Sequence, residues 1–164
     1  MKTISTTILT LIALVGAAIA GTYKAPKKDP IASIAFPDNW NVEVEDESLD
    51  ATTGDEDIYI NIEFHDVEAL QEAIQESFGY FAKNKVKIDK ASQKKQDADV
   101  KGIKVINYDW DGEDEHGKCK ISLTILAVTE KKALLMLYWA SPEAEKKHEQ
   151  ELGAIQESIT KLAK

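Results

Sequence analysis

The stretch that decides the fold is "KALLMLYWASPE", residues 132–143. Every residue from Ala133 to Ala140 is apolar, so both faces of this segment need to be covered. A strand buried on both faces is expected in the middle of a sheet that has a layer on either side. Ser141 is suited to cap the N-terminus of a helix, and Pro142 is suited to the first helical position. The sequence therefore predicts a central strand followed at once by the last helix.

Outward from this strand, the preceding segments alternate as half-buried strands do. In "IYINIEF", residues 58–64, every second side chain is a large hydrophobe, and "KCKISLTILAVTE", residues 118–130, alternates in the same way. Further strands are expected at 31–36 and 40–46, joined as a hairpin through Pro37, and two more within 85–112, on either side of a polar connection at 93–99. The acidic segment 45–57 has no hydrophobic period and is expected to be a solvated loop.

Two amphipathic helices are expected. Asp66 is placed to cap the first, in which apolar residues recur at helical spacing from Val67 to Phe81. The second begins at Pro142, and its inner stripe consists of Ala144, His148, Leu152, Ile155, Ile159 and Leu162. Short connections favour antiparallel pairing, and each helix must cover a face of the sheet. The predicted fold is α+β: a single antiparallel β-sheet flanked by helices on both faces, an α-β-α sandwich.

The N-terminus has the features of a secretory signal peptide. Lys2 precedes an apolar run that is too short to span a bilayer, and Ala18 and Ala20 form the small-residue pattern of a cleavage site. We therefore expect a signal peptide at 1–20 cleaved after Ala20, a flexible leader at 21–30 and a single domain at 31–164. The mature protein is expected to be periplasmic or secreted, without an integral membrane segment.

Charge narrows the range of partners. The chain has 20 basic residues, all of them Lys, and 29 acidic residues. Removing residues 1–20 takes away one Lys and leaves a net charge of 19 − 29 = −10. A surface of this sign repels nucleic acid and anionic lipid headgroups, and without Arg the chain lacks the side chain best suited to bidentate phosphate binding. A protein partner is expected instead.

The stretch "DWDGEDEHGKC", residues 109–119, is the best candidate for a metal site. An EF-hand loop requires Gly at position 6 and Glu at position 12, whereas here Gly112 is fourth and Lys120 is twelfth. A structural zinc site requires four ligands, and only His116 and Cys119 are suitably spaced. Neither type of site fits this stretch.

The favoured interpretation of this stretch is the turn of a hairpin with solvated charges, in which Gly112 and Gly117 supply unusual backbone angles. One alternative is transition-metal binding, and the other is a weak calcium site, completed by carboxylates from residues 43–57. Its ligands would be Asp109, Asp111, Glu113 and Asp114. No other cofactor is expected, and Cys119 is expected to lie on the buried face of its strand.

Catalytic motifs do not emerge from the sequence. It contains neither G-x-S-x-G nor H-E-x-x-H, His65 is expected at the surface or as a cap, and His148 is expected in the packed stripe of the last helix. Aromatic residues are enriched where proteins bind each other, which makes Trp40 and Trp110 the candidates for partner binding. Core or rim packing is nevertheless the favoured interpretation for both, and Trp110, beside the acidic residues, is the better candidate for exposure.

Four segments resemble the PsbP-like superfamily in order and spacing, over most of residues 31–162. They are "IAFPDNWNV" (34–42), "VKGIKVINYDW" (100–110), "LLMLYWASPEAE" (134–145) and "IQESITKL" (155–162). The superfamily includes the extrinsic photosystem II subunit and small exported bacterial DcrB-like proteins. The resemblance implies an α-β-α sandwich that serves as a binding or assembly module and not as an enzyme.

These observations lead to one functional prediction. The chain is expected to be an exported, non-enzymatic binding or assembly module of the bacterial envelope, with a protein partner. A contiguous exposed apolar patch would favour this function. The alternatives are weak calcium binding through the acidic loops or an uncharacterised enzyme, for which a deep pocket with converging carboxylates would be expected.

Overall fold

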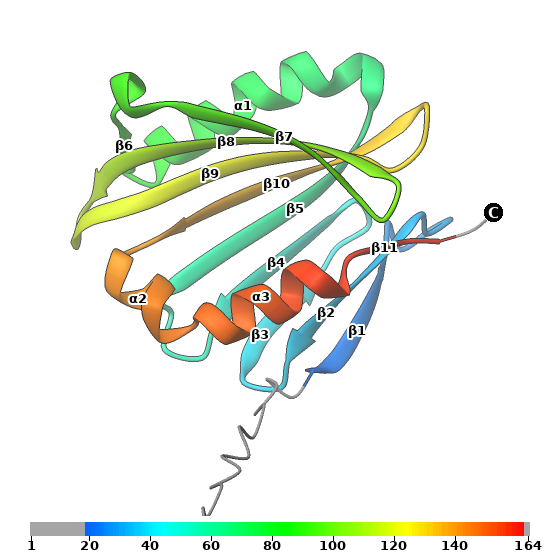
Figure 1. The fold of residues 1–164 in the computed structure, drawn as a ribbon, viewed down its shortest axis with the longest axis horizontal. Coiled ribbons are helices and arrows are strands. Elements are labelled where there is room, and N and C mark those ends of the chain that lie inside the picture. The colour runs from blue at the N-terminus through cyan, green and yellow to red at the C-terminus, as the bar shows by residue number, and fades with distance from the viewer. Residues whose placement is uncertain (1–18, 163–164) are drawn as a thin grey trace, which may run out of the picture.

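The computed structural model describes residues 19–162, in which a large, twisted antiparallel sheet forms the centre of the molecule (Figure 1). Its strand order is β3-β4-β5-β10-β9-β8-β6, and β7 also pairs with β8. The strands are β3 (Trp40–Val44), β4 (Ser48–Thr53), β5 (Ile58–Asp66), β6 (Lys87–Ile88), β7 (Lys94–Val100), β8 (Ile103–Asp114), β9 (Gly117–Ala127) and β10 (Lys132–Ala140).

The apolar strand β10 lies in the middle of this sheet, as its sequence predicts. It pairs with β5 on one side and with β9 on the other. Leu134 faces the core on one side of the sheet, while Leu135 and Leu137 face the core on the other side, and all three are at most 1% exposed. The prediction of a central strand covered on both faces is confirmed.

One face of the sheet is covered by helix α1 (Leu70–Lys83), which follows the short 3-10 helix η1 (Val67–Ala69). Ala73 and Phe81 of α1 pack on Trp110, Cys119 and the inward side chains of β9 and β10. The predicted helix is confirmed, except that its first turn after Asp66 is a 3-10 turn and that the Asp66 side chain makes no capping hydrogen bond. Cys119 is 2% exposed, as its place in the alternation indicated.

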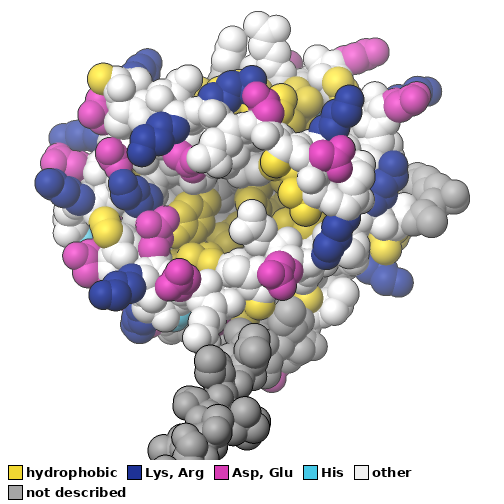
Figure 2. Space-filling view, in the orientation of Figure 1, with side chains coloured by type: hydrophobic (Ala, Val, Ile, Leu, Met, Phe, Trp, Pro, Cys, Tyr) yellow, Lys and Arg dark blue, Asp and Glu magenta, His cyan; other side chains and the backbone are white. Residues whose placement is uncertain are grey.

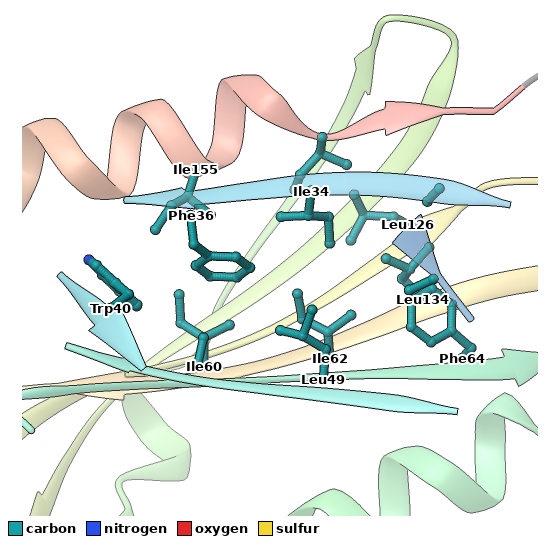
Figure 3. Close-up of a cluster of buried hydrophobic side chains, with 14 of the residues drawn as sticks. Ile34, Phe36, Trp40, Leu49, Ile60, Ile62, Phe64, Leu126, Leu134 and Ile155 are labelled. Atoms are coloured by element: carbon teal, nitrogen blue, oxygen red, sulfur yellow. The ribbon is translucent and has the colours of Figure 1, made fainter. Parts of the chain in front are cut away.

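The opposite face is covered by a second, three-stranded sheet together with the last helices. This small sheet has the order β1-β2-β11, formed by β1 (Ile19–Ala25), β2 (Ala32–Pro37) and β11 (Thr160–Lys161). Ile34 and Phe36 of β2 point toward Leu49, Ile60 and Ile62 of the large sheet (Figure 3).

The last helices, on the same side of the large sheet, are α2 (Pro142–Lys147) and α3 (Glu149–Ser158). Helix α3 runs along β2, where the Ser158 hydroxyl bonds both the amide and the carbonyl of Ala35.

The prediction of a single sheet is therefore wrong, and so is the predicted hairpin between 31–36 and 40–46. Strands β2 and β3 belong to different sheets, and the turn at Pro37 leads the chain from one sheet to the other. Both strands are apolar on their inner sides, with Phe36 and Trp40 in the same core. Facing each other across that core buries more apolar surface than pairing side by side with one face open.

The flexible leader expected at 21–30 is ordered over its first half. Residues 21–25 pair regularly with β2, from Gly21 opposite Phe36 to Ala25 opposite Ala32. Tyr23 and Ala25 point inward, whereas Thr22 and Lys24 are exposed. This alternation is too short to be recognised as a strand in the sequence, because two prolines follow it closely. Most of the predicted signal peptide lies outside the described residues, and its cleavage stays a prediction.

Three further segments differ from expectation. The loop expected at 45–57 contains β4, whose inward residues are Leu49, Ala51 and Thr53. The polar connection at 93–99 is strand β7, which is exposed along its whole length and so has no apolar period. The last helix is interrupted at His148 (φ −105°, ψ 15°) and ends at Ser158, after which the chain extends into β11.

Among residues 19–162, no helix combines the length and apolar character needed to cross a membrane.

Candidate functional site

The acidic stretch 109–119 is a β-hairpin, as favoured by the sequence. Strands β8 and β9 pair down to Asp114 opposite Gly117, which leaves a tight turn at Glu115 and His116. The carboxylate of Asp114 accepts the amide N–H groups of His116 (2.8 Å) and Gly117 (3.0 Å). Gly117 has a φ of +132°, which requires glycine. Most of the stretch is therefore strand, and the loop itself is short.

Gly112 is needed for space and not for an unusual angle. A Cβ at this position would lie 2.4 Å from Cδ1 of Ile121 and 2.5 Å from the backbone oxygen of Lys87. The latter atom belongs to β6, which pairs with β8 at Gly112. The absence of a side chain at Gly112 lets the short edge strand β6 approach β8.

Three of the four carboxylates proposed as calcium ligands have separate hydrogen-bond partners, and the fourth lies opposite a lysine. Asp109 accepts hydrogen bonds from Ser122 (2.6 Å) and Asn107 (2.8 Å). Asp111 pairs with Lys120, whose hydrogen bond lowers the pKa of the carboxyl group. Glu113 lies opposite Lys118, and Asp114 closes the turn. Completion by residues 43–57 is wrong, because three strands, β5, β10 and β9, separate β8 from β4.

Both tryptophans proposed for partner binding are buried. Trp110 is 4% exposed, packs on Phe78 of α1 and directs its N–H toward Gln93. Trp40 is 6% exposed, packs on Phe36 and donates its N–H to Glu151 at 2.8 Å. The suggestion that Trp110 is exposed is wrong, because even-numbered residues of β8 in this region face α1. The favoured interpretation, core or rim packing, is confirmed for both.

Sequence reasoning missed a charged cluster at the junction of α2 and α3. The imidazole of His148, which is 7% exposed, lies between two carboxylates. Its Nδ1 is 2.9 Å from Oε2 of Glu151, and its Nε2 is 3.3 Å from Oδ2 of Asp55 in the turn between β4 and β5. Lys147 extends its ammonium to Asp55 (2.5 Å) and Asp57 (3.0 Å). We call Asp55, Asp57, Lys147, His148 and Glu151 the junction cluster.

Two carboxyl groups of the junction cluster have lowered pKa values. For Asp55 the main cause is the hydrogen bond from Lys147, followed by one from Thr53. For Glu151, burial alone would raise the pKa, but hydrogen bonds from Trp40, His148 and Asn39 together outweigh it. Both groups are thus held in their ionised form by donors from separate elements.

The second feature that sequence reasoning missed is a part of the large sheet that the small sheet and α3 do not cover. Side chains that are neighbours across the strands form rows on this face of the large sheet. Each row is apolar where it lies beneath the small sheet and polar at the outer strands. One row runs through Ala51, Ile60, Tyr138, Ser122, Asp109 and Lys94, and the next through Leu49, Ile62, Met136, Thr124, Asn107 and Gln96. We call the outer part of these rows, from β10 to β7, the open face.

Hydrogen bonds connect the polar groups of the open face. Thr124 donates to Asn107 at 2.6 Å, and Asn107 and Ser122 both donate to the carboxylate of Asp109. Nearby, Tyr138 donates to Glu145 of α2 at 3.1 Å. Burial is the main cause that raises the pKa of Glu145. A partly buried polar network thus joins β8 and β9, and the Tyr138–Glu145 pair lies beside it.

Apolar side chains accompany this network. Val105, Met136, Tyr138 and Leu152 are only partly buried and belong to the edge of the core. Figure 2 shows hydrophobic side chains at the floor of a hollow between the β7–β8 strands and α3. A cavity of about 260 Å³ on the open face extends from Lys94 and Gln96 to Glu145, and a cavity of about 580 Å³ over α2 and α3 shares Glu145 with it.

A larger cavity, about 690 Å³, lies elsewhere. It is formed by the segments 26–31, 45–48 and 63–65 and contains the His65–Glu63 pair, in which the ring Nε2 is 2.8 Å from the carboxylate. His65 is a partly exposed surface residue, as expected from the sequence. Most residues that line this cavity are charged, and none of them belongs to the hydrogen-bonded network of the open face.

The arrangement of the two sheets with α1 on one side and α3 on the other is a PsbP-like fold, as the sequence resemblance predicted. The solution structure of cyanobacterial PsbP (CyanoP) from Synechocystis sp. PCC 6803 matches with a TM-score of 0.57 and 8% identity, over 93% of this chain and 99% of that chain. The crystal structure of LpqN, involved in cell envelope biogenesis of Mycobacterium tuberculosis, matches with a TM-score of 0.56 and 12% identity, over 87% and 91% of the two chains. Neither a family model nor a curated protein matches the sequence.

Proposed function

We propose that the chain is an exported, non-enzymatic binding or assembly module of the bacterial cell envelope, and that it binds its protein partner at the open face. The observation that carries the proposal is the open face itself. There the apolar interior of the large sheet reaches the surface beside a hydrogen-bonded polar network.

The chemistry of the open face favours a polypeptide partner. An apolar floor with fixed polar groups around it is the usual composition of a binding site, in which the apolar part supplies affinity and the polar part fixes orientation. Asp109 and Glu145 offer acceptors for N–H groups. A partner segment with an apolar side chain and a basic or amide group would complement both, and the net negative charge of the chain would attract a basic partner.

Two further considerations support a binding role in the envelope. The PsbP-like fold is shared with LpqN, and that protein is involved in cell envelope biogenesis. The predicted signal peptide would direct this chain to the same compartment.

Site-specific photo-crosslinking in cells tests this proposal. A photoreactive amino acid in place of Gln96, on β7 opposite Asn107, is expected to capture a distinct envelope protein. Ser122→Trp, which fills the open face, should abolish that crosslink. Thr22→Trp, at an exposed position on the small sheet, should leave it unchanged. A crosslink that survives Ser122→Trp, or is lost equally with Thr22→Trp, would rule out binding at the open face.

A further inference from the structure

We propose that Asp55, Asp57 and His148 form a binding site for a divalent transition metal ion such as Zn²⁺. One ligand atom from each residue, a carboxylate oxygen of each aspartate and an imidazole nitrogen, lies within 4.8 Å of the other two. Among residues 19–162 this is the one group of three His, Cys, Asp or Glu side chains with that geometry. A nitrogen and carboxylate oxygens are ligands that zinc and similar ions accept.

The orientation of His148 fits a metal ligand. A histidine that binds a metal through one ring nitrogen usually donates the other N–H to a carboxylate, which fixes the tautomer and the ring plane. Glu151 is such a partner, with its Oε2 2.9 Å from Nδ1 of His148. Glu151 is itself held by the N–H of Trp40 at 2.8 Å and the amide of Asn39 at 3.1 Å.

The other ring nitrogen points to an aspartate of the proposed site. Nε2 of His148 lies 3.3 Å from Oδ2 of Asp55 in a largely buried place, since His148 is 7% exposed. A metal ion at this position would bind the imidazole nitrogen and the carboxylate oxygen together.

The ammonium of Lys147 shows that the aspartates accept a cation between them. It lies 2.5 Å from Asp55 and 3.0 Å from Asp57. The Lys147 side chain is 56% exposed, so it is free to swing into solvent when a metal ion takes its place. Lys147 therefore competes with a metal ion for the two aspartates, and replacing Lys147 should strengthen metal binding. A site that consists only of an ion-pair network would respond in the opposite way, by losing stability without gaining affinity for metals.

Binding of Co²⁺ and Zn²⁺ to the exported protein tests the proposal, with Co²⁺ followed by its visible absorption and Zn²⁺ by calorimetry. Asp57→Asn should weaken binding at least about tenfold. Glu56→Gln is the matched control, since it removes the same charge one residue away in the same exposed turn, and it should bind as the parent does. Lys147→Met should bind more tightly than the parent.

The outcomes are distinct. Absence of binding in both the parent and Lys147→Met, or an equal effect of Asp57→Asn and Glu56→Gln, would overturn the proposal. If Asp57→Asn fails to fold by circular dichroism, the comparison of Lys147→Met with the parent decides, because only a metal site predicts tighter binding. A rise in the parent's melting temperature with Zn²⁺ that EDTA reverses would provide independent support.

Discussion

Trp40 connects two kinds of interaction within one side chain. Its ring packs in the core against Phe36, and its N–H reaches the partly buried carboxylate of Glu151. A buried indole of this kind needs an acceptor, because an unsatisfied N–H in the core is costly. Trp40 thereby joins the core of the two sheets to the junction cluster.

Trp40→Phe tests this connection. It keeps an aromatic ring but removes the donor to a charged group, whereas Trp110→Phe removes a donor whose acceptor is the neutral Gln93 at 3.3 Å. We expect the free energy of unfolding to fall by about 1 kcal/mol more for Trp40→Phe than for Trp110→Phe, since hydrogen bonds to charged groups are the stronger ones. Urea denaturation of both variants measures the difference, and equal losses would contradict it.

The lowered pKa of Asp55 predicts how stability depends on pH. Because the pKa of this group is lower in the folded than in the unfolded state, where it is near 3.8, its ionised form stabilises the fold above about pH 4. That stabilisation is lost as the pH falls below this value and the carboxyl group takes up a proton. Asp55→Asn should therefore be less stable than the parent at pH 7, and the gap should narrow as the pH falls from 4 toward 2 in denaturation series at fixed salt. A gap independent of pH would be evidence against the Lys147–Asp55 pair as its source.

The residues of the two candidate sites differ in how far the sequence reveals them. The alternation in 103–111 contains the information that Trp110 faces inward while Asp109 faces the other way. The junction cluster has no such local signal, because His148 and Asp55 are 93 positions apart in the chain. Only the path of the chain from β4 to α3 brings them together.

At the scale of single elements, β10 carries the packing on both sides of the large sheet. Leu135 is 0% exposed and packs in the core beneath α1, so its truncation removes buried surface that the neighbouring strands cannot fill. We expect Leu135→Ala to lower the free energy of unfolding by about 2–5 kcal/mol. Val100→Ala is the control, since Val100 is 38% exposed on β7 and should cost less than about 0.5 kcal/mol. Chemical denaturation decides, and a small effect at Leu135 would contradict its central position.

Elements with a long and regular pattern could be predicted from the sequence, whereas several short or fully exposed ones could not. Strands β5, β9 and β10 and helix α1 have nine or more residues and a clear buried side. Strand β7 has no buried side at all, and β11 has two residues. These segments are strands because their backbones pair with a neighbouring strand. Such pairing leaves no signal in the hydrophobic pattern of the sequence.

At the scale of the whole molecule, the two faces of the large sheet are covered differently. Helix α1 lies over one face, while the small sheet and α3 cover only part of the other. The sequence predicted two covering layers but not their composition, because a turn such as that at Pro37 has the same local features in a hairpin and in a corner between sheets. The incomplete cover produces the open face.

The start of the mature protein is a prediction about the molecule as a whole. Pairing of β1 with β2 is irregular between Ile19 and Gly21 and regular from Gly21 onward, so cleavage after Ala20 would keep the regular part of the strand. We expect the exported protein to begin at Gly21. Mass spectrometry of the intact protein checks this, and a mature form that starts beyond Ala25 would lack β1 and contradict it.

The position of β2 between β1 and β11 determines the order in which the small sheet can form during synthesis. Its neighbours in the small sheet are β1, close to it in the chain, and β11, which arrives much later: Thr160 bonds Ser33 across 127 positions. Until residues 160–161 leave the ribosome, one edge of β2 has no strand to pair with, and contacts between such distant residues form slowly. For a chain that we propose to be exported, this delay keeps the polypeptide from reaching its final structure while it is being made, which suits a translocation channel that accepts only unfolded polypeptide.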